Sequence, residues 1–139
     1  MKLTMLVLVF FVCASLYSQT AVAPSGLGTQ ASPYLISSWQ NLYWISQNSG
    51  EWDKHYEQTG DLDFAAASPA INTWDGGAGW TPIGNSSTKF TGSYDGQEYT
   101  ISNLYINRPD EEWVGFFGSI LSSASLTDVI LSDVGVEGY

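Results

Sequence analysis

The segment from Phe90 to Ile106 has a hydrophobic pattern that neither a helix nor a flat strand explains. It begins with strand-like alternation and turns at Asp95-Gly96. Its apolar residues then lie three and two positions apart, at Ile101, Leu104 and Ile106. An amphipathic helix requires steps of three and four, and a flat strand requires steps of two. A different backbone arrangement is therefore needed to point these side chains inward.

A second segment, Val114 to Val136, has the same spacing. Its apolar positions are Leu126, Val129, Leu131, Val134 and Val136. Aligning the two segments sets Phe90–Tyr94 against Phe116–Ile120 and Thr100–Ile106 against Ser125–Leu131, with Asn103 opposite Asp128. A step of three is expected where the chain turns a corner, and asparagine and aspartate tolerate the left-handed backbone of such corners. Short strands, corners and a repeat together predict a mainly β fold, with parallel β-helix (solenoid) coils over residues 55–139.

An antiparallel hairpin is the competing interpretation of the first segment. Asp-Gly between alternating runs is a strong hairpin signal, and it occurs at Asp95-Gly96. A hairpin leaves the second segment unexplained, because that segment has no such dipeptide. The shared three-two spacing favours the solenoid.

The residues before this repeat predict a short capping unit. Residues 24–32 are small and flexible and are interpreted as a linker, and residues 33–54 as an N-terminal cap. Within the cap, Pro33–Ile36 predicts a strand, and a helix capped by Ser37 or Ser38 is expected to run to about Asn48. His55–Phe64 alternates weakly, which predicts one strand. The small and turn-forming residues of 65–79 predict a surface loop.

The first 23 residues have the pattern of a secretory signal peptide. One lysine precedes an apolar run that is too short to span a bilayer comfortably, and small and polar residues follow it. Cleavage after Ser18 and cleavage after Ala23 are both open, and an uncleaved membrane anchor is the alternative. An exported protein without membrane insertion after cleavage, either secreted or at the cell surface, is the expectation.

Charge and cysteine content exclude several classes of function. The net charge is −10, and removal of the leader leaves Lys54, Lys89 and Arg108 against fourteen acidic residues. Nucleic acid and anionic lipid surfaces are therefore not expected partners. The only cysteine, Cys13, lies in the leader, so the mature chain has no disulfide and no cysteine metal site.

The stretch "VGFFGSILSSASLTDVILSDVGVEG" (114–138) resembles the repeat of bacterial GLUG-motif proteins. Gly115-Phe116-Phe117-Gly118 is similar to the opening of that motif, although Phe116 stands where leucine is expected, and the turn at 122–124 lacks the usual glycine. The resemblance implies a secreted or surface-displayed repeat protein. It implies a non-enzymatic structural or adhesin-like module, without cofactors. Some relatives in that family carry such repeats beside a secreted peptidase or glycoside hydrolase, which leaves an accessory repeat region as an alternative.

Only one full repeat is present, and the pattern stops without a cap. A coil contacts only its neighbours, so a chain with few coils and an open end is expected to be truncated. We therefore expect this chain to be the N-terminal part of a longer protein, or to pair through its uncapped C-terminal coil.

Candidate site residues are few. Six tryptophans exceed what a small core needs, and carbohydrate binding is a further alternative function, with surface glycans or extracellular matrix as partners. Trp39, Trp44 and Trp80 are expected mainly to pack the cap on the first coil, whereas Trp74 is expected to be exposed. The candidate ligand-binding residues are Trp74, Asp75, Trp80 and Asn85.

No catalytic or metal-binding set is predicted. His55 has no partner that the sequence signals, and it is expected at the surface, at the start of a strand. Asp61 and Asp63 would share one face of a strand, where glycoside hydrolysis and calcium binding are conceivable. Neighbouring acids on a solvent-facing strand are the ordinary explanation, and we prefer it.

Overall fold

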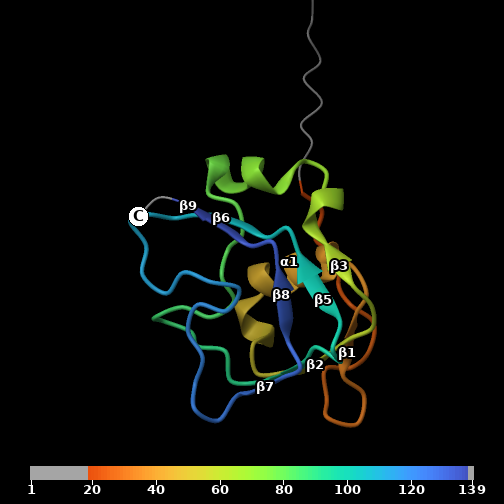
Figure 1. Cartoon of the computed structure of the whole chain (residues 1–139). Helices are drawn as coiled ribbons and strands as arrows, with labels where there is room; N and C mark the ends of the chain where they lie inside the picture. The colour runs from red at the N-terminus through yellow and green to blue at the C-terminus, as the bar shows by residue number, and fades with distance from the viewer. Residues whose placement is uncertain (1–18, 138–139) are drawn as a thin grey trace, which may run out of the picture.

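Short parallel strands dominate the computed structural model, which describes residues 19–137 (Figure 1). They form three sheets, with the orders β1-β2-β4-β7, β3-β5-β8 and β6-β9. Every pairing between named strands is parallel within this range. The strands are β1 Tyr34–Ile36, β2 His55–Gln58, β3 Leu62–Asp63, β4 Ser93–Asp95, β5 Thr100–Ser102, β6 Tyr105–Asn107, β7 Ser125–Thr127, β8 Ile130–Ser132 and β9 Gly135–Glu137.

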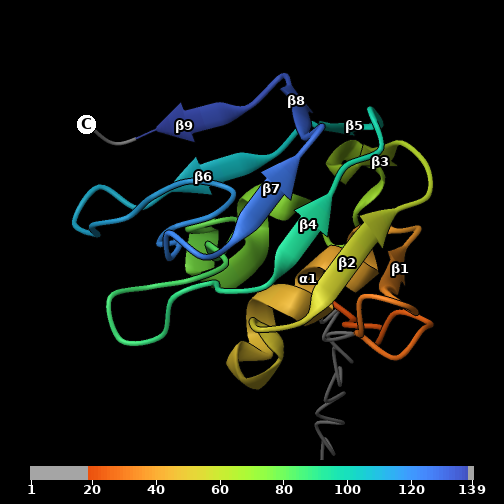
Figure 2. The same cartoon turned by 90° about the horizontal axis from the view of Figure 1, so that it is seen from below.

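The last six strands visit the three sheets twice in the same order. Strands β4, β5 and β6 enter the three sheets in turn, and β7, β8 and β9 then lie beside them (Figure 2). The paired residues are Tyr94 with Leu126, Ile101 with Leu131, and Ile106 with Val136. The predicted parallel pairing of the two segments is confirmed. The hairpin alternative is wrong, because the chain after Asp95-Gly96 enters a different sheet.

The corners between these strands explain the three-two spacing. Asn103 and Asp128 have φ angles of 57° and 50°, which confirms the left-handed backbone predicted for them. Asp133 has a φ of 51°. Each of these residues lies between two strands of different sheets, so it redirects the chain and the next side chain points inward again.

The alignment of the two segments was wrong in detail. The sequence alignment matched Asn103 with Asp128. In the structure, Asn103 is equivalent to Asp133. The Asn103 backbone N–H donates to the carbonyl of Ser132, the residue before Asp133, over 3.2 Å. Asp128 instead lies beside Gly96, whose N–H bonds to the preceding residue Thr127 over 2.9 Å. The loops absorb different numbers of residues, so a match of local sequence did not give the register.

The space between the sheets is filled by a largely aromatic core. Buried apolar side chains come from all three sheets and from the connecting segments. The buried Tyr94 ring stacks on Tyr56 at 6.4 Å, and its hydroxyl donates to Gln58 Oε1 over 3.1 Å. Burial raises the pKa of Tyr94, which keeps the hydroxyl protonated as a hydrogen-bond donor.

One helix, α1 (Trp39–Gln47), covers the core beside the first sheet. Its N-cap is Ser38, whose side chain accepts from the Asn41 backbone N–H, so the predicted cap and helix are confirmed. Leu42 and Ile45 are fully buried on its inner face. Trp39 packs on Trp74, with ring centroids 5.3 Å apart.

Two predictions for residues 55–79 were wrong. The single strand expected over His55–Phe64 is two strands, because a turn after Gln58 carries β3 into a second sheet. The surface loop expected at 65–79 contains a short 3-10 helix, Phe64–Ala66, and a kinked one, Ile71–Gly77. Ile71 and Trp74 from the second helix are buried. Small residues and turn formers made this segment look like a loop, but its few large side chains belong to the core.

The segment before β1 folds back on its neighbours. Ser25 forms an antiparallel bridge with Leu35, and the Leu35 N–H donates to the Ser25 carbonyl over 2.7 Å. Val22 bonds to α1 in both directions: its N–H donates to Gln40 O, and its carbonyl accepts from Asn41 Nδ2 over 2.9 Å. Most of the predicted signal peptide, residues 1–18 with Cys13, lies outside the described residues.

Gly92 gives a direct test of how closely adjacent strands approach. A Cβ at Gly92 would lie 2.0 Å from the Lys54 carbonyl oxygen, which accepts the Ser93 N–H. We expect Gly92→Ala to lower the free energy of unfolding by more than ~2 kcal/mol, because backbone must move. Gly60→Ala, with nothing within 4 Å, should change it by no more than ~1 kcal/mol. Equal denaturant midpoints for the two variants would contradict this packing.

The bonds of Val22 predict which of the two candidate cleavage sites is used. Cleavage after Ala23 would remove Val22 and leave the amide of the buried Asn41 without its carbonyl acceptor. Cleavage after Ser18 preserves both bonds. Sequencing of the exported protein should therefore find Gln19 at the mature N-terminus, and a mature chain that starts at Pro24 would contradict the prediction.

Candidate functional site

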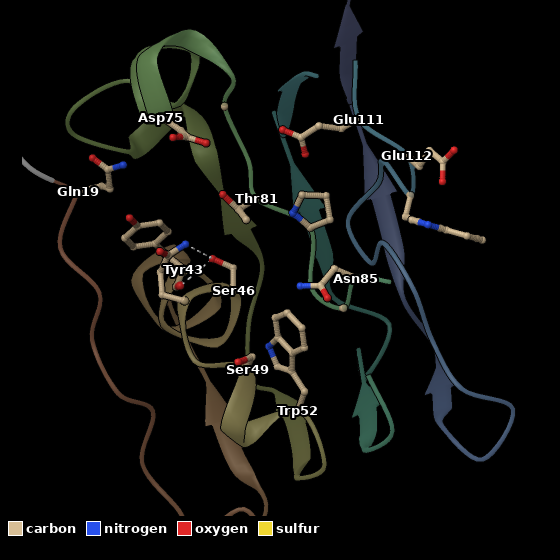
Figure 3. A pocket seen from close by; sticks show the side chains of 15 residues that line it. Gln19, Tyr43, Ser46, Ser49, Trp52, Asp75, Thr81, Asn85, Glu111 and Glu112 are labelled. Carbon is tan, nitrogen blue, oxygen red and sulfur yellow. Dashed lines mark hydrogen bonds between the residues drawn. The ribbon is translucent and has the colours of Figure 1, made fainter. Parts of the chain in front are cut away.

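A polar groove lies between α1 and the loops before β4 and after β6 (Figure 3). Its volume is about 540 Å³, which is within the usual range for small-ligand sites. Tyr43 and Ser46 lie on one side, Thr81 and Asn85 on the other, and Asp75 at one end. The full lining is Gln19, Tyr43, Ser46, Gln47, Ser49, Trp52, Asp75, Gly79, Thr81, Pro82, Gly84, Asn85, Glu111, Glu112 and Trp113.

Arg108 holds one wall of this groove together. Its side chain is only 6% exposed, and it donates to the carboxylates of Asp75 and Glu111, each over 2.7 Å. It also donates from Nε to the Trp80 carbonyl over 2.9 Å and from Nη2 to Thr81 Oγ1 over 3.1 Å. One guanidinium thereby joins the 3-10 helix Ile71–Gly77, the segment at 80–81 and the loop after β6.

Arg108 is held in its protonated, positively charged form. Burial alone would lower its pKa, but the hydrogen bonds that it donates to Asp75 and Glu111 outweigh this effect, so the net shift is upward. The guanidinium is therefore charged at neutral pH. Since both carboxylates are about half exposed, each retains oxygen lone pairs that face solvent and the groove.

The structure separates the four sequence-predicted ligand residues into two pairs. Asp75 and Asn85 line the groove. Trp74 was predicted to be exposed, and this is wrong: it is 1% exposed, packed against Trp39, Tyr43 and Phe64, and its Nε1–H donates to the Pro69 carbonyl. Trp80 is fully buried on Phe64 and Phe116. A glycine-rich sequence context suggested exposure, but Trp39 and Tyr43 of α1 pack on the Trp74 ring and cover it.

Most residues of the groove lining were not proposed as ligand residues from the sequence, and Glu111, Glu112 and Trp113 are among them. Trp113 is 55% exposed and has a φ of 65°. Neither the closeness of this loop to α1 nor its left-handed backbone has a local sequence signal, so no motif could have revealed them.

Asp61 and Asp63, considered for catalysis or calcium, serve the backbone instead. Asp61 Oδ1 accepts the Thr100 N–H, and Asp63 Oδ1 accepts from the Ala65 N–H and Asn103 Nδ2, each over 2.8 Å. The bond from Asn103, with a smaller contribution from Ala65, lowers the pKa of Asp63. No group of three or more metal-ligating side chains occurs among the described residues.

His55 lies at the start of β2, as predicted, and has a partner that the sequence did not indicate. Its Nδ1 lies 2.7 Å from Ser93 Oγ on the adjacent strand β4. The two residues line a shallower hollow of about 340 Å³ on the outer face of the first sheet. No hydrogen bond from Nε2 to a carboxylate is recorded within residues 19–137, so a third residue that would complete a triad is not in place there.

The edge formed by β7, β8 and β9 is the second candidate functional surface. Its apolar residues occupy the same inward positions as Tyr94, Ile101 and Ile106, which are at most 1% exposed. At the edge, however, the side chains are between 37% and 42% exposed: Leu126, Leu131, Val134 and Val136. The backbone N–H and C=O groups on the outer side of these strands have no paired strand in the described chain.

Comparison with known proteins finds similar segments in two much longer chains. The first is Halomucin from Haloquadratum walsbyi, with 41% identity over 113 residues, which is 81% of this chain and 1% of that protein. The second is a putative Gly-rich membrane protein from Evansella cellulosilytica, with 31% identity over 137 residues, which is 94% of this chain and 15% of that protein. No family model matches the chain. No solved structure matches it. Every helix in the described residues is too short or too polar to traverse a lipid bilayer.

The role of Arg108 can be tested with a variant that matches its change in charge. Arg108→Met removes bonds to three segments, and we expect it to lower the free energy of unfolding by about 1–3 kcal/mol; the two carboxylates are half exposed, so the cost is less than for a fully buried pair. Lys89→Met removes one exposed positive charge and should change stability by less than ~0.5 kcal/mol. Chemical denaturation measures both, and equal effects would show that Arg108 acts only through net charge.

Proposed function

We propose that this chain is a non-enzymatic structural or adhesive module of an exported surface protein, built as a β-solenoid whose open edge accepts another parallel coil. The observation that carries the proposal is the stacking of β7, β8 and β9 on β4, β5 and β6. Because each strand repeats the position of the one beneath it, a further strand in the same sense can be added without changing the pattern.

The exposed apolar residues of the edge support this function. Leu131 and Val136 point in the direction that their paired residues Ile101 and Ile106 occupy in the core, yet they remain partly exposed. An unpaired strand edge with exposed apolar side chains tends to pair with other strands unless something covers it. At the opposite end of the first sheet, β1 is bridged by Ser25 of the preceding segment, so this sheet has its fully unpaired edge at β7.

The relatives support a surface setting. The chain spans 1% of one similar protein and 15% of the other, so in both cases the similar segment is a small part of a long polypeptide. One of these proteins is named as a mucin and the other as a membrane protein. We infer an analogous placement for this chain, at the cell surface or secreted, and the predicted signal peptide agrees with it. The proposed kinship with GLUG-motif repeats fits the same architecture.

The open edge should make the chain self-associate, since a second copy presents the same strands. In sedimentation velocity we expect reversible association that increases with protein concentration. Leu131→Lys places a charge on the edge and should weaken the association about tenfold, the equivalent of ~1.4 kcal/mol.

Leu27→Lys is the matched control. Leu27 is exposed and lies in the segment that pairs with β1, at the other end of the sheet order. The same change there should leave association intact. A chain that stays monomeric at high concentration and unfolds cooperatively would show that the edge needs no further coil, and the proposed function would be wrong.

A further inference from the structure

We propose that the groove beside α1 binds an uncharged saccharide, with the indole of Trp113 as the stacking surface and Asn85, Asp75 and Glu111 as partners for hydroxyl groups. This inference names a ligand for a surface distinct from the open edge. It uses the surface setting proposed above only to say where the glycan is met, so the binding itself can hold or fail independently of that function.

Trp113 is the first step of the argument. A bulky aromatic residue with a φ of 65° is a conformational outlier, and an outlier of this kind persists only where the surroundings impose it. The packing around Gly118 shows how the surroundings hold the Trp113 backbone. A Cβ at Gly118 would lie 2.6 Å from the Trp113 carbonyl oxygen and 2.4 Å from that of Gly84. The backbone of Trp113 is thus held by close packing while more than half of the residue stays exposed. An exposed aromatic ring on a fixed backbone is suited to flat apolar faces, such as those of pyranose rings.

The polar groups of the groove form the second step. Asn85 Oδ1 accepts the backbone N–H groups of Ser87 and Thr88, which fixes the side chain in its turn. Its Nδ2 has no hydrogen bond to another described residue and is left as a donor. Asp75 and Glu111 are positioned by Arg108 and retain free lone pairs as acceptors. Fixed donors and acceptors in the same groove lining as an exposed indole suit the vicinal hydroxyl groups of a sugar.

The charge of the lining selects the class of saccharide. The charged groups that line the groove are carboxylates, from Asp75, Glu111 and Glu112, and the guanidinium of Arg108 is buried behind the wall. Uronates, sulfated glycans and other polyanions are repelled by this surface. A cationic ligand gains less than the three carboxylates suggest, because Asp75 and Glu111 already share the charge of Arg108. An uncharged glycan is not repelled by the carboxylates, and its binding does not depend on charge that Arg108 already neutralises.

Isothermal titration calorimetry of the whole chain tests the proposal. The probes are neutral hexasaccharides of glucose, xylose, mannose and N-acetylglucosamine, beside oligogalacturonate and chitosan oligomers of similar length. We expect at least one neutral hexasaccharide to bind more tightly than both charged probes. Trp113→Ala should weaken that binding about tenfold or more, and Trp113→Phe, which keeps a ring, should lose less.

Tyr99→Ala is the matched control, because Tyr99 is an exposed aromatic residue that does not line the groove. Its binding should equal that of the unaltered chain, and circular dichroism spectra that match for all variants would exclude unfolding as the cause of a loss. Absence of binding by every neutral probe would overturn the proposal. So would unchanged binding by Trp113→Ala, or a preference for chitosan oligomers. None of these results would affect the self-association expected of the open edge.

Discussion

Parallel backbone pairing between successive passes of the chain is the constraint on which this structure depends. A strand of three residues cannot hold itself in place, and most strands here have that length. Each strand gains order from the strand beside it, and each corner must end at the height of the corner beneath it. The close approach of Gly92 to Lys54 and of Gly96 to Asp128 follows from this stacking, since adjacent passes meet there backbone to backbone. Left-handed corners at Asn103, Asp128 and Asp133 then allow sharp turns without extra chain length.

Aromatic packing and one buried arginine stabilise the parts of the molecule that strand pairing does not hold. Isoleucine and leucine side chains share the interior with large aromatic rings, several of which come from the connecting segments. Trp74 and Trp80 have this role, with indole N–H groups bonded to the carbonyls of Pro69 and Phe116. Arg108 joins loops that have no regular pairing of their own. The side of the molecule with the irregular loops thereby becomes as well defined as the side with the strands, and it is there that the groove forms.

The two candidate surfaces have different physical characters. The edge is apolar, and its unpaired backbone is periodic, so a strand that paired there would need similar spacing but little chemical selectivity. The groove is polar, and its residues come from α1, the 3-10 helices Ser49–Glu51 and Ile71–Gly77, and loops far apart in the sequence. Its shape depends on how those parts are assembled, as is typical of ligand sites. A module that extends a stalk at one surface and contacts a glycan at another would combine the structural and adhesive roles in one chain.

The sequence by itself determined the local elements and the direction of the side chains. The three-two spacing of Ile101, Leu104 and Ile106, the Ser38 cap and the left-handed corner residues all depend on chemistry within a few positions of each residue, so they could be read directly. Only the tertiary structure decided which strands are neighbours, because the register depends on loop lengths that a local match does not measure. It also decided that Trp74 is buried and Trp113 exposed. Both residues lie among turn formers and acids, and their exposure depends on which distant segments come to cover them.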